Sequence, residues 1–266
     1  MSQTIEHSSQ KIFISTLGEH TANSTEYNTN IIVSIPPIII PQNDDHVPII
    51  GIESLVLPLS YQMINIDNNI LKLNSVVYTI PSGNYTITTL MEILNLFDVG
   101  VLIFTYNVDT NQLSLKVVGA PTTYTIQTGT TCDRVLGCLV TNLPVASETV
   151  FPSIVNLATN TSVLVQIANI NTKNYDNITG ANNIISKIPI NSQPNQVLNY
   201  FNNQPFYSTI TNKTLQLLNI VLLTDNHKPL RLFGNPDWAI TVRIDYIRKE
   251  AKRLNPTAIQ QMRHKN

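Results

Sequence analysis

The sequence predicts a mainly β protein, in which a β sandwich is interrupted by a small inserted module of mixed α and β structure. The first observation behind this prediction is the stretch from Leu215 to Ile247. Its last part alternates with a period of two, which is typical of a strand with one buried and one wetter face. The buried side would carry Trp238, Ile240, Val242, Ile244 and Tyr246, and the wetter side Ala239, Thr241, Arg243, Asp245 and Ile247. The segment Leu215–Leu223 is apolar at nearly every position, which predicts a strand covered on both faces.

Extended apolar segments near the N-terminus are the second observation. Residues 11–17, 29–40 and 49–59 have strand character, residues 61–66 are again extended and apolar, and turn residues separate the segments. Pro36 and Pro37 either end the second segment or mark it as a sheet edge, because proline cannot donate a ladder hydrogen bond. Residues 1–66 therefore predict the first part of the sandwich.

The third observation is a change of pattern in the middle of the chain. Thr89 and Glu92 have the spacing of a capping box, and Leu90, Ile93, Leu94 and Phe97 would share one face of the helix that follows. Residues 101–108 and 112–118 predict a hairpin, residues 124–128 a short strand, and residues 130–138 one or two helical turns that end at Gly137. Residues 67–141 are thus expected to form a compact inserted module.

The remaining segments return to strand patterns. Residues 142–160 are expected to be a loop on the sandwich side, and residues 162–170, 184–190, 196–201 and 230–233 to be strands. The resulting division is a discontinuous sandwich of residues 1–66 and 142–248, the module of residues 67–141 and a basic tail of residues 249–266. Two consecutive separate domains are the alternative.

Composition narrows the classes of function. Charged residues make up 12% of the chain, half of the ~25% that is usual, and the net charge is −1. The chain as a whole therefore gives no electrostatic case for binding nucleic acid or an anionic membrane. The basic tail is interpreted as solubilising, with contact to nucleic acid or membrane as the alternative. The low charge reflects either an AT-rich genome or a surface that touches neighbouring molecules.

Residues that could carry chemistry are few and scattered. The histidines His7, His20, His46, His227 and His264 lack a metal-ligand spacing, and no nucleotide-binding or nucleophile-elbow motif occurs. Asp44-Asp45-His46 is interpreted as a solvated loop, and Trp238 as a packing residue. Without a recognisable secretory signal, Cys132 and Cys138 are expected to be reduced core residues. No catalytic, metal-binding or cofactor-binding residue is therefore predicted, and neither is a small-molecule substrate or an enzyme.

Four short segments resemble one group of viral proteins. Ile80–Ile87 and Arg134–Gly137, with the helix and hairpin between them, are similar to a module of minor capsid proteins of double-stranded DNA viruses. Leu222–Asp225 and Asp237–Ile240 look like the closing strands of the same proteins. The family is the jelly-roll penton and minor capsid proteins of virophages, polinton-like viruses and large nucleocytoplasmic DNA viruses, and the resemblance extends over residues 11–248.

This resemblance implies a jelly-roll β sandwich that works as a structural virion protein. The protein would be the penton at the vertices of an icosahedral shell, or a minor capsid protein that cements the major capsid protein. The implied partners are copies of the chain itself, favouring a homopentamer, the major capsid protein and other minor capsid proteins, in a virion assembled inside the host cell. The alternative function is a receptor- or carbohydrate-binding virion head, with residues 67–141 as the binding element.

Overall fold

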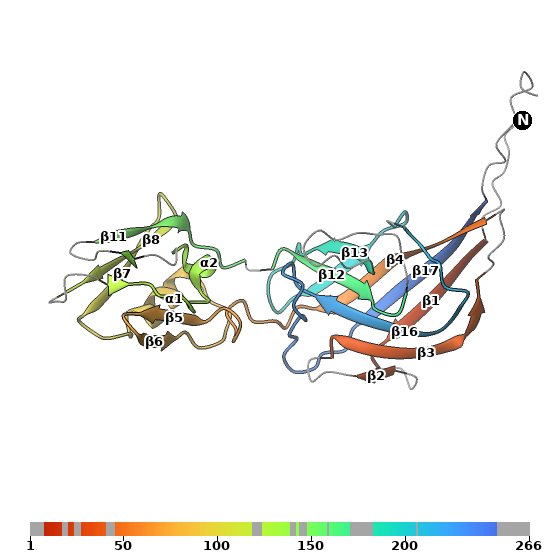
Figure 1. Cartoon of the computed structure of the whole chain (residues 1–266), viewed down its shortest axis with the longest axis horizontal. Helices are drawn as coiled ribbons and strands as arrows, with labels where there is room; N and C mark the ends of the chain where they lie inside the picture. Colours follow the sequence, from red (N-terminus) through yellow and green to blue (C-terminus); the bar gives the residue numbers. More distant parts are fainter. Residues whose placement is uncertain are drawn as a thin grey trace, which may run out of the picture.

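The described part of the chain forms two lobes joined by a narrow waist (Figure 1). The computed structural model describes residues 8–17, 21–23, 28–40, 46–118, 124–138, 142–143, 148–158, 160–170, 183–205 and 207–248. Each lobe has its own buried apolar cluster. Tyr61 packs in the cluster of the larger lobe and Ile64 in that of the smaller lobe. The chain therefore crosses the waist between these two residues, and it returns after Leu157, which packs on the cluster of the smaller lobe.

The larger lobe is a β sandwich of two sheets that enclose one core. The first sheet has the order β1-β17-β4-β14, with β15 beside β4, and the second has the order β13-β12-β16-β3-β2. The bounds are Ser8–Ser15 (β1), Thr21–Asn23 (β2), Asn30–Ile39 (β3), His46–Pro58 (β4), Ser162–Ile167 (β12), Ile184–Pro189 (β13), Val197–Phe201 (β14), Ser208–Thr209 (β15), Thr214–Leu223 (β16) and Ala239–Arg248 (β17).

The strand pairing shows that this sandwich is a jelly roll. Eight of the described strands, β1, β3, β4, β12, β13, β14, β16 and β17, pair as if one long hairpin were rolled up. The first pairs with the last, the second with the seventh, the third with the sixth and the fourth with the fifth, all antiparallel. This nested pairing in two sheets is that of a jelly roll. The predicted fold class is thereby confirmed, and β1 and β17, the first and last of the described strands, lie side by side in one sheet.

The alternation predicted for β17 places the core. Ile240, Val242 and Ile244 are buried between the sheets and are in register with the N-terminal strand, where Ile12 faces Val242. Trp238 is buried as well, and its indole N–H donates to the carbonyl oxygen of Asn28 at 2.6 Å. Its predicted packing role is confirmed. Residues 220–223 of β16 are buried at every position, as expected for a strand covered on both faces, but Gln216 and Leu217 are exposed, so the prediction is wrong for the first half of the strand.

The prolines of β3 lie inside the strand. Among the described residues β2 pairs only with Ile31–Val33, so no described strand requires a ladder hydrogen bond from Pro36 or Pro37 on that side. On the other side, the register with β16 shifts between Leu215 and Leu217. The edge alternative is therefore the correct one.

The smaller lobe packs two helices against short sheets around its own core. Its elements are Ile70–Leu73 (β5), Val76–Thr79 (β6), Ile87–Leu94 (α1), Leu102–Asn107 (β7), Gln112–Val117 (β8), Tyr124–Thr125 (β9), Asp133–Leu136 (α2), Asn142–Leu143 (β10) and Thr149–Ile154 (β11). Leu90 and Leu94 bury the predicted face of α1. The capping box lies earlier than predicted: Thr86 is the N-cap and Thr89 its partner, so Thr89 with Glu92 is wrong.

The loop predicted for residues 142–160 is a second correction. Thr149–Ile154 forms β11, pairs with β8 and buries Phe151 in the core of the smaller lobe. The sequence did not indicate a strand here because Pro152 interrupts the segment. In the structure, the register with β8 shifts around this proline, between Val150 and Ile154. This strand extends the smaller lobe beyond the predicted boundary at residue 141.

Two further segments, residues 230–233 and 61–66, do not form the regular strands that were expected. The strand expected at residues 230–233 is absent from the described ladders, although Leu230 and Leu232 are buried in the sandwich core. The apolar residues of this segment therefore belong to a buried loop and not to a strand. The extended segment expected at residues 61–66 makes only an isolated bridge, Ile64 with Gly83.

Several predictions concern residues outside the described ranges. They include the basic tail 249–266, Asp44 and Asp45, and the histidines at positions 7, 20 and 264. Among the described residues, no helix has the length and apolar character needed to cross a membrane.

Candidate interaction surfaces

The outer face of the β1-β17-β4-β14 sheet carries a row of uncharged side chains. Phe13, Thr241, Ser54 and Phe201 are neighbours in register, one from each strand in turn. These residues alternate with inward-facing core residues along their strands, so they face away from the core. The hydroxyls of Ser54 and Thr241 bond to each other at 2.8 Å, which ties β4 to β17 at the centre of the row.

Apolar side chains dominate the exposed part of this row. Phe13 is 78% exposed and Phe201 is 68% exposed. Val56, two residues after Ser54, and Val197, which lies opposite Pro58, are also exposed. We refer to Phe13, Ser54, Val56, Val197, Phe201 and Thr241 as the apolar face. Single exposed apolar residues are ordinary, but a group on one sheet face is typical of an interaction surface.

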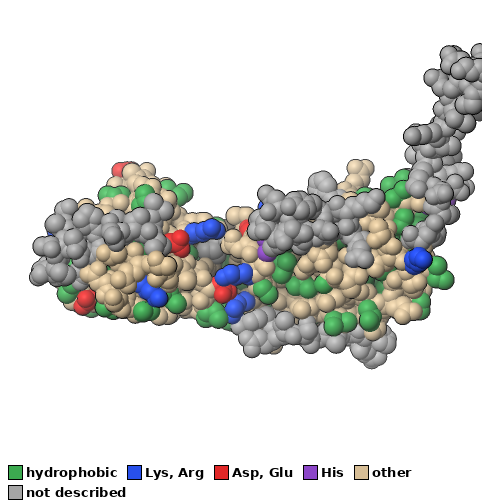
Figure 2. All heavy atoms as spheres, viewed as in Figure 1, with side chains coloured by type: hydrophobic (Ala, Val, Ile, Leu, Met, Phe, Trp, Pro, Cys, Tyr) green, Lys and Arg blue, Asp and Glu red, His purple; other side chains and the backbone are tan. Residues whose placement is uncertain are grey.

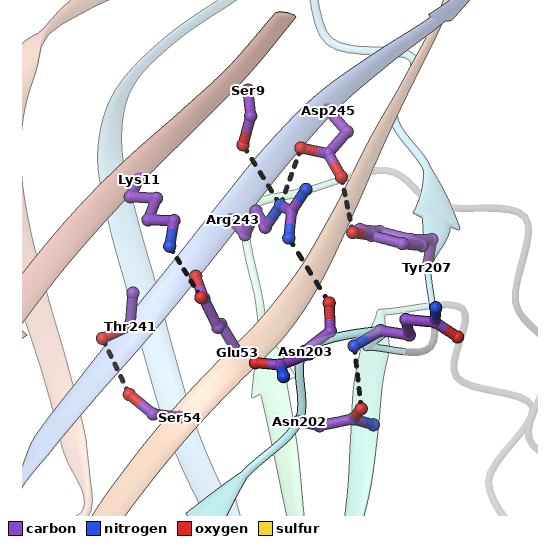
Figure 3. A network of polar contacts seen from close by, with 11 residues as sticks. Ser9, Lys11, Glu53, Ser54, Asn202, Asn203, Tyr207, Thr241, Arg243 and Asp245 are labelled. Carbon is purple, nitrogen blue, oxygen red and sulfur yellow. Dashed lines mark hydrogen bonds and ion pairs between the residues drawn. The ribbon is translucent and has the colours of Figure 1, made fainter. Parts of the chain in front are cut away.

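A charged network lies beside the apolar face on the same sheet (Figure 3). Lys11 pairs with Glu53 at 2.7 Å, and the Nε of Arg243 donates to Asp245 at 2.9 Å. Tyr207, from the segment before β15, donates its hydroxyl to the other oxygen of Asp245 at 2.5 Å. The predicted exposure of this side of β17 is therefore wrong for Asp245, which is 4% exposed, and also for Thr241, which is 9% exposed. Alternation along β17 could not reveal that Tyr207, 38 residues away, covers this carboxylate.

The electrostatics of the network favour its charged form. Burial acts to raise the pKa of Asp245, but hydrogen bonds from Tyr207 and Arg243 outweigh it and hold that pKa below its ordinary value. Burial and the same carboxylate raise the pKa of Tyr207 to about 12. At neutral pH Asp245 is thus an anion and Tyr207 a donor. The network fixes β17 and the segment before β15 together without adding net charge to the face.

Charged side chains also gather at the waist between the lobes, as Figure 2 shows. Asp67 of the smaller lobe contacts Arg231 at 3.2 Å and Lys228 at 3.6 Å, both from the larger lobe. Arg134 of α2 donates to the side chain of Asn226 at 3.4 Å. These contacts border a cleft of about 500 Å³ that residues of both lobes line. We refer to it as the interlobe cleft.

Asp225 stiffens one wall of the interlobe cleft. Its carboxylate accepts hydrogen bonds from the backbone and side-chain groups of Thr161 and Ser162 at the start of β12. Burial acts to raise the pKa of Asp225, and these hydrogen bonds more than offset that effect, so the pKa lies below its ordinary value. The partners of Asp225 lie more than 60 residues away, and no local pattern indicates them.

The described histidines and cysteines form no metal-binding group. His46 begins β4, and His227 lies in the turn after β16. In the described ranges, no three His, Cys, Asp or Glu side chains are grouped so that they could hold a metal ion. Cys132 and Cys138 are free thiols buried in the core of the smaller lobe, as predicted. Burial raises the pKa of both, that of Cys138 to about 12.

Comparison with known proteins found similarity at the level of solved structures. The mavirus penton protein, solved by crystallography, is 12% identical, with 90% of this chain and all of that chain covered and a TM-score of 0.46. A chain of the Sputnik virophage, solved by cryo-electron microscopy, is 11% identical, with 93% of this chain and 99% of that chain covered and a TM-score of 0.41. No family model and no curated protein matches. The strand pairing, independent of these comparisons, establishes the jelly roll.

Proposed function

We propose that this chain is a structural protein of an icosahedral virion, acting as the penton or as a minor capsid protein. It would associate with copies of itself, with a major capsid protein and with other minor capsid proteins. The observation that carries the proposal is the apolar face on the outside of a jelly-roll sheet. Jelly rolls serve viral shells, lectins and enzymes alike, so the surface and not the fold must indicate the role.

The physical case compares two free energies: the gain from burying the apolar side chains of this face, and the cost of removing water from its polar groups. Phe13 and Phe201 together offer a large apolar area, and aromatic residues are enriched at the centres of protein interfaces. The central Ser54 and Thr241 hydroxyls already bond to each other, so covering them leaves less unsatisfied hydrogen-bonding capacity. The charged side chains beside the apolar face are paired with each other, Lys11 with Glu53 and Arg243 with Asp245, which lowers the desolvation cost of an interface.

A penton role fits a face of this kind. A surface that binds a different surface on the next copy forms a ring when the rotation closes. Five-fold closure would make a vertex protein, and we favour this homopentamer over a cement role. Native mass spectrometry and negative-stain microscopy of the purified chain test the choice. Five-membered rings are expected. Monomers or trimers that bind only to a preformed lattice of the major capsid protein would assign the cement role, and failure to associate with either would overturn the proposal.

We further propose that the two lobes are separate folding units, a discontinuous sandwich and an inserted domain. Their buried clusters are distinct: Met63 packs on the cluster of the larger lobe, whereas Ile64 and Leu157 contribute to that of the smaller lobe. Replacing residues 63–158 by a short glycine-serine linker should leave a sandwich that unfolds cooperatively with a strand-rich circular dichroism spectrum. A molten or insoluble product would show that the sandwich needs the smaller lobe.

A further inference from the structure

The interlobe cleft has the dimensions and position of a ligand site. Its volume of about 500 Å³ lies within the range of ~300–1,000 Å³ that is usual for small-molecule pockets. Such pockets occur preferentially where two domains meet. The sandwich contributes Tyr61, Asn160 and the turn after β16, while the smaller lobe contributes Asn65, Asp67, Asn68, the start of α2 and Asn156.

The charges that line the cleft balance one another. Three acidic and three basic side chains occur among its described lining residues. Asp67 is engaged by Lys228 and Arg231, and Asp225 is held by the start of β12. A phosphate would need a basic excess and a metal ion an acidic one. The balance therefore favours an uncharged polar ligand.

Part of the hydrogen-bonding capacity in the cleft is unused. The side chains of Asp133, Asn156 and Asn160 make no hydrogen bond or ion pair with any described residue. Beside Asp133, the guanidinium of Arg134 makes a single 3.4 Å hydrogen bond within the described chain, to Asn226. A carboxylate only accepts, a guanidinium only donates, and an amide does both.

A ligand that complements this set must donate and accept at several neighbouring positions. Sugar hydroxyls do both, so a saccharide complements these side chains without carrying a charge of its own. We propose that the interlobe cleft binds a saccharide, with Asp133, Arg134 and Asn156 as its polar contacts. Recognition would then require both lobes and not the inserted residues 67–141 alone. The inference is independent of shell assembly, because a chain that binds no sugar can still join a shell.

The test uses the full-length chain and matched variants. Wild type would be applied to an array of immobilised glycans, and the strongest class would be titrated as a soluble oligosaccharide by calorimetry. Asp133→Ala and Asn156→Ala should each weaken binding about tenfold or more, since each removes hydrogen bonds to the ligand. Asp109→Ala, in the exposed β7–β8 turn of the same lobe, should bind like wild type. Thermal unfolding of each variant verifies that the fold is intact.

Three outcomes would overturn the inference. The first is that no glycan is retained on the array. The second is binding that folded Asp133→Ala and Asn156→Ala variants leave unchanged, which would place the sugar elsewhere. The third is displacement of the saccharide by an equal concentration of inorganic phosphate, which would identify an anion site. Assembly measured on the same variants separates this result from the capsid role.

Discussion

Replacing Phe13 and Phe201 by serine should weaken self-association while leaving the fold intact. A phenylalanine side chain offers ~200 Å² of apolar surface. With 78% of Phe13 and 68% of Phe201 exposed, roughly 150 and 135 Å² remain to be covered by a neighbour. At ~25 cal/mol per Å², full burial is worth about 3–4 kcal/mol for each side chain. This is an upper value, because a contact rarely covers a side chain completely.

The expected effect on association follows directly. Even half of that energy corresponds to at least a tenfold weaker contact for each substitution, because ~1.4 kcal/mol is a factor of ten. The cost to folding should stay within about 0.5 kcal/mol, as is usual for surface substitutions. Sedimentation velocity over a concentration series measures association, and thermal unfolding measures the fold.

Leu96→Ser and Val99→Ser supply the matched control. Leu96 is 67% exposed and Val99 is 76% exposed, so they match the two phenylalanines in exposure but lie in the smaller lobe after α1. This pair should associate like wild type. The reasoning is refuted if the double phenylalanine variant keeps the association constant of wild type, or if both pairs weaken it equally.

Three further predictions concern the fold that supports these surfaces. Gly137→Ala should destabilise by about 2–5 kcal/mol, because left-handed strain adds to overpacking against the Ser153 carbonyl oxygen, 2.1 Å from the new Cβ. Gly100→Ala, with similar positive φ but open space, should cost only about 1–2 kcal/mol, and urea unfolding compares the two. Cys132 and Cys138 should not react with a disulfide reagent at pH 8 until denaturant is added, since the thiolate is the reactive form. Asp245→Asn should cost about 1–3 kcal/mol in urea unfolding at neutral pH. Because the folded pKa of Asp245 lies below its ordinary 3.8, that difference should persist down to about pH 4 and shrink at lower pH, and a constant difference down to pH 2 would contradict the assignment.

Local patterns predicted those features that depend on nearby residues. The alternation of β17 correctly placed Ile240, Val242 and Ile244 in the core, because side chains on a strand change faces at every step. The C-terminal end of α2 was also predictable, since Gly137 adopts the left-handed conformation that favours glycine. The face of a strand residue and the end of a helix both depend on residues that are close in the sequence.

Features that depend on distant partners could not be predicted in the same way. The burial of Asp245 depends on Tyr207, and β11 depends on a strand more than 30 residues earlier to complete its ladder. The apolar face could not be predicted from the sequence for the same reason. Phe13 and Phe201 become neighbours in one row only through the nested pairing of the jelly roll, which no single segment encodes.

The position of the inserted lobe explains how one chain can carry both the apolar face and a separate interlobe cleft. The insertion connects β4 in one sheet to β12 in the other, so it leaves from the end of the sandwich. β4 keeps its ladders with β17 and β14, and β12 keeps those with β13 and β16. The described polar contacts across the waist, from Asp67 and Arg134, are partly exposed and worth at most about 1 kcal/mol each. Excision of the smaller lobe should therefore remove the interlobe cleft while the apolar face persists, so the two proposed activities are separable in a single variant.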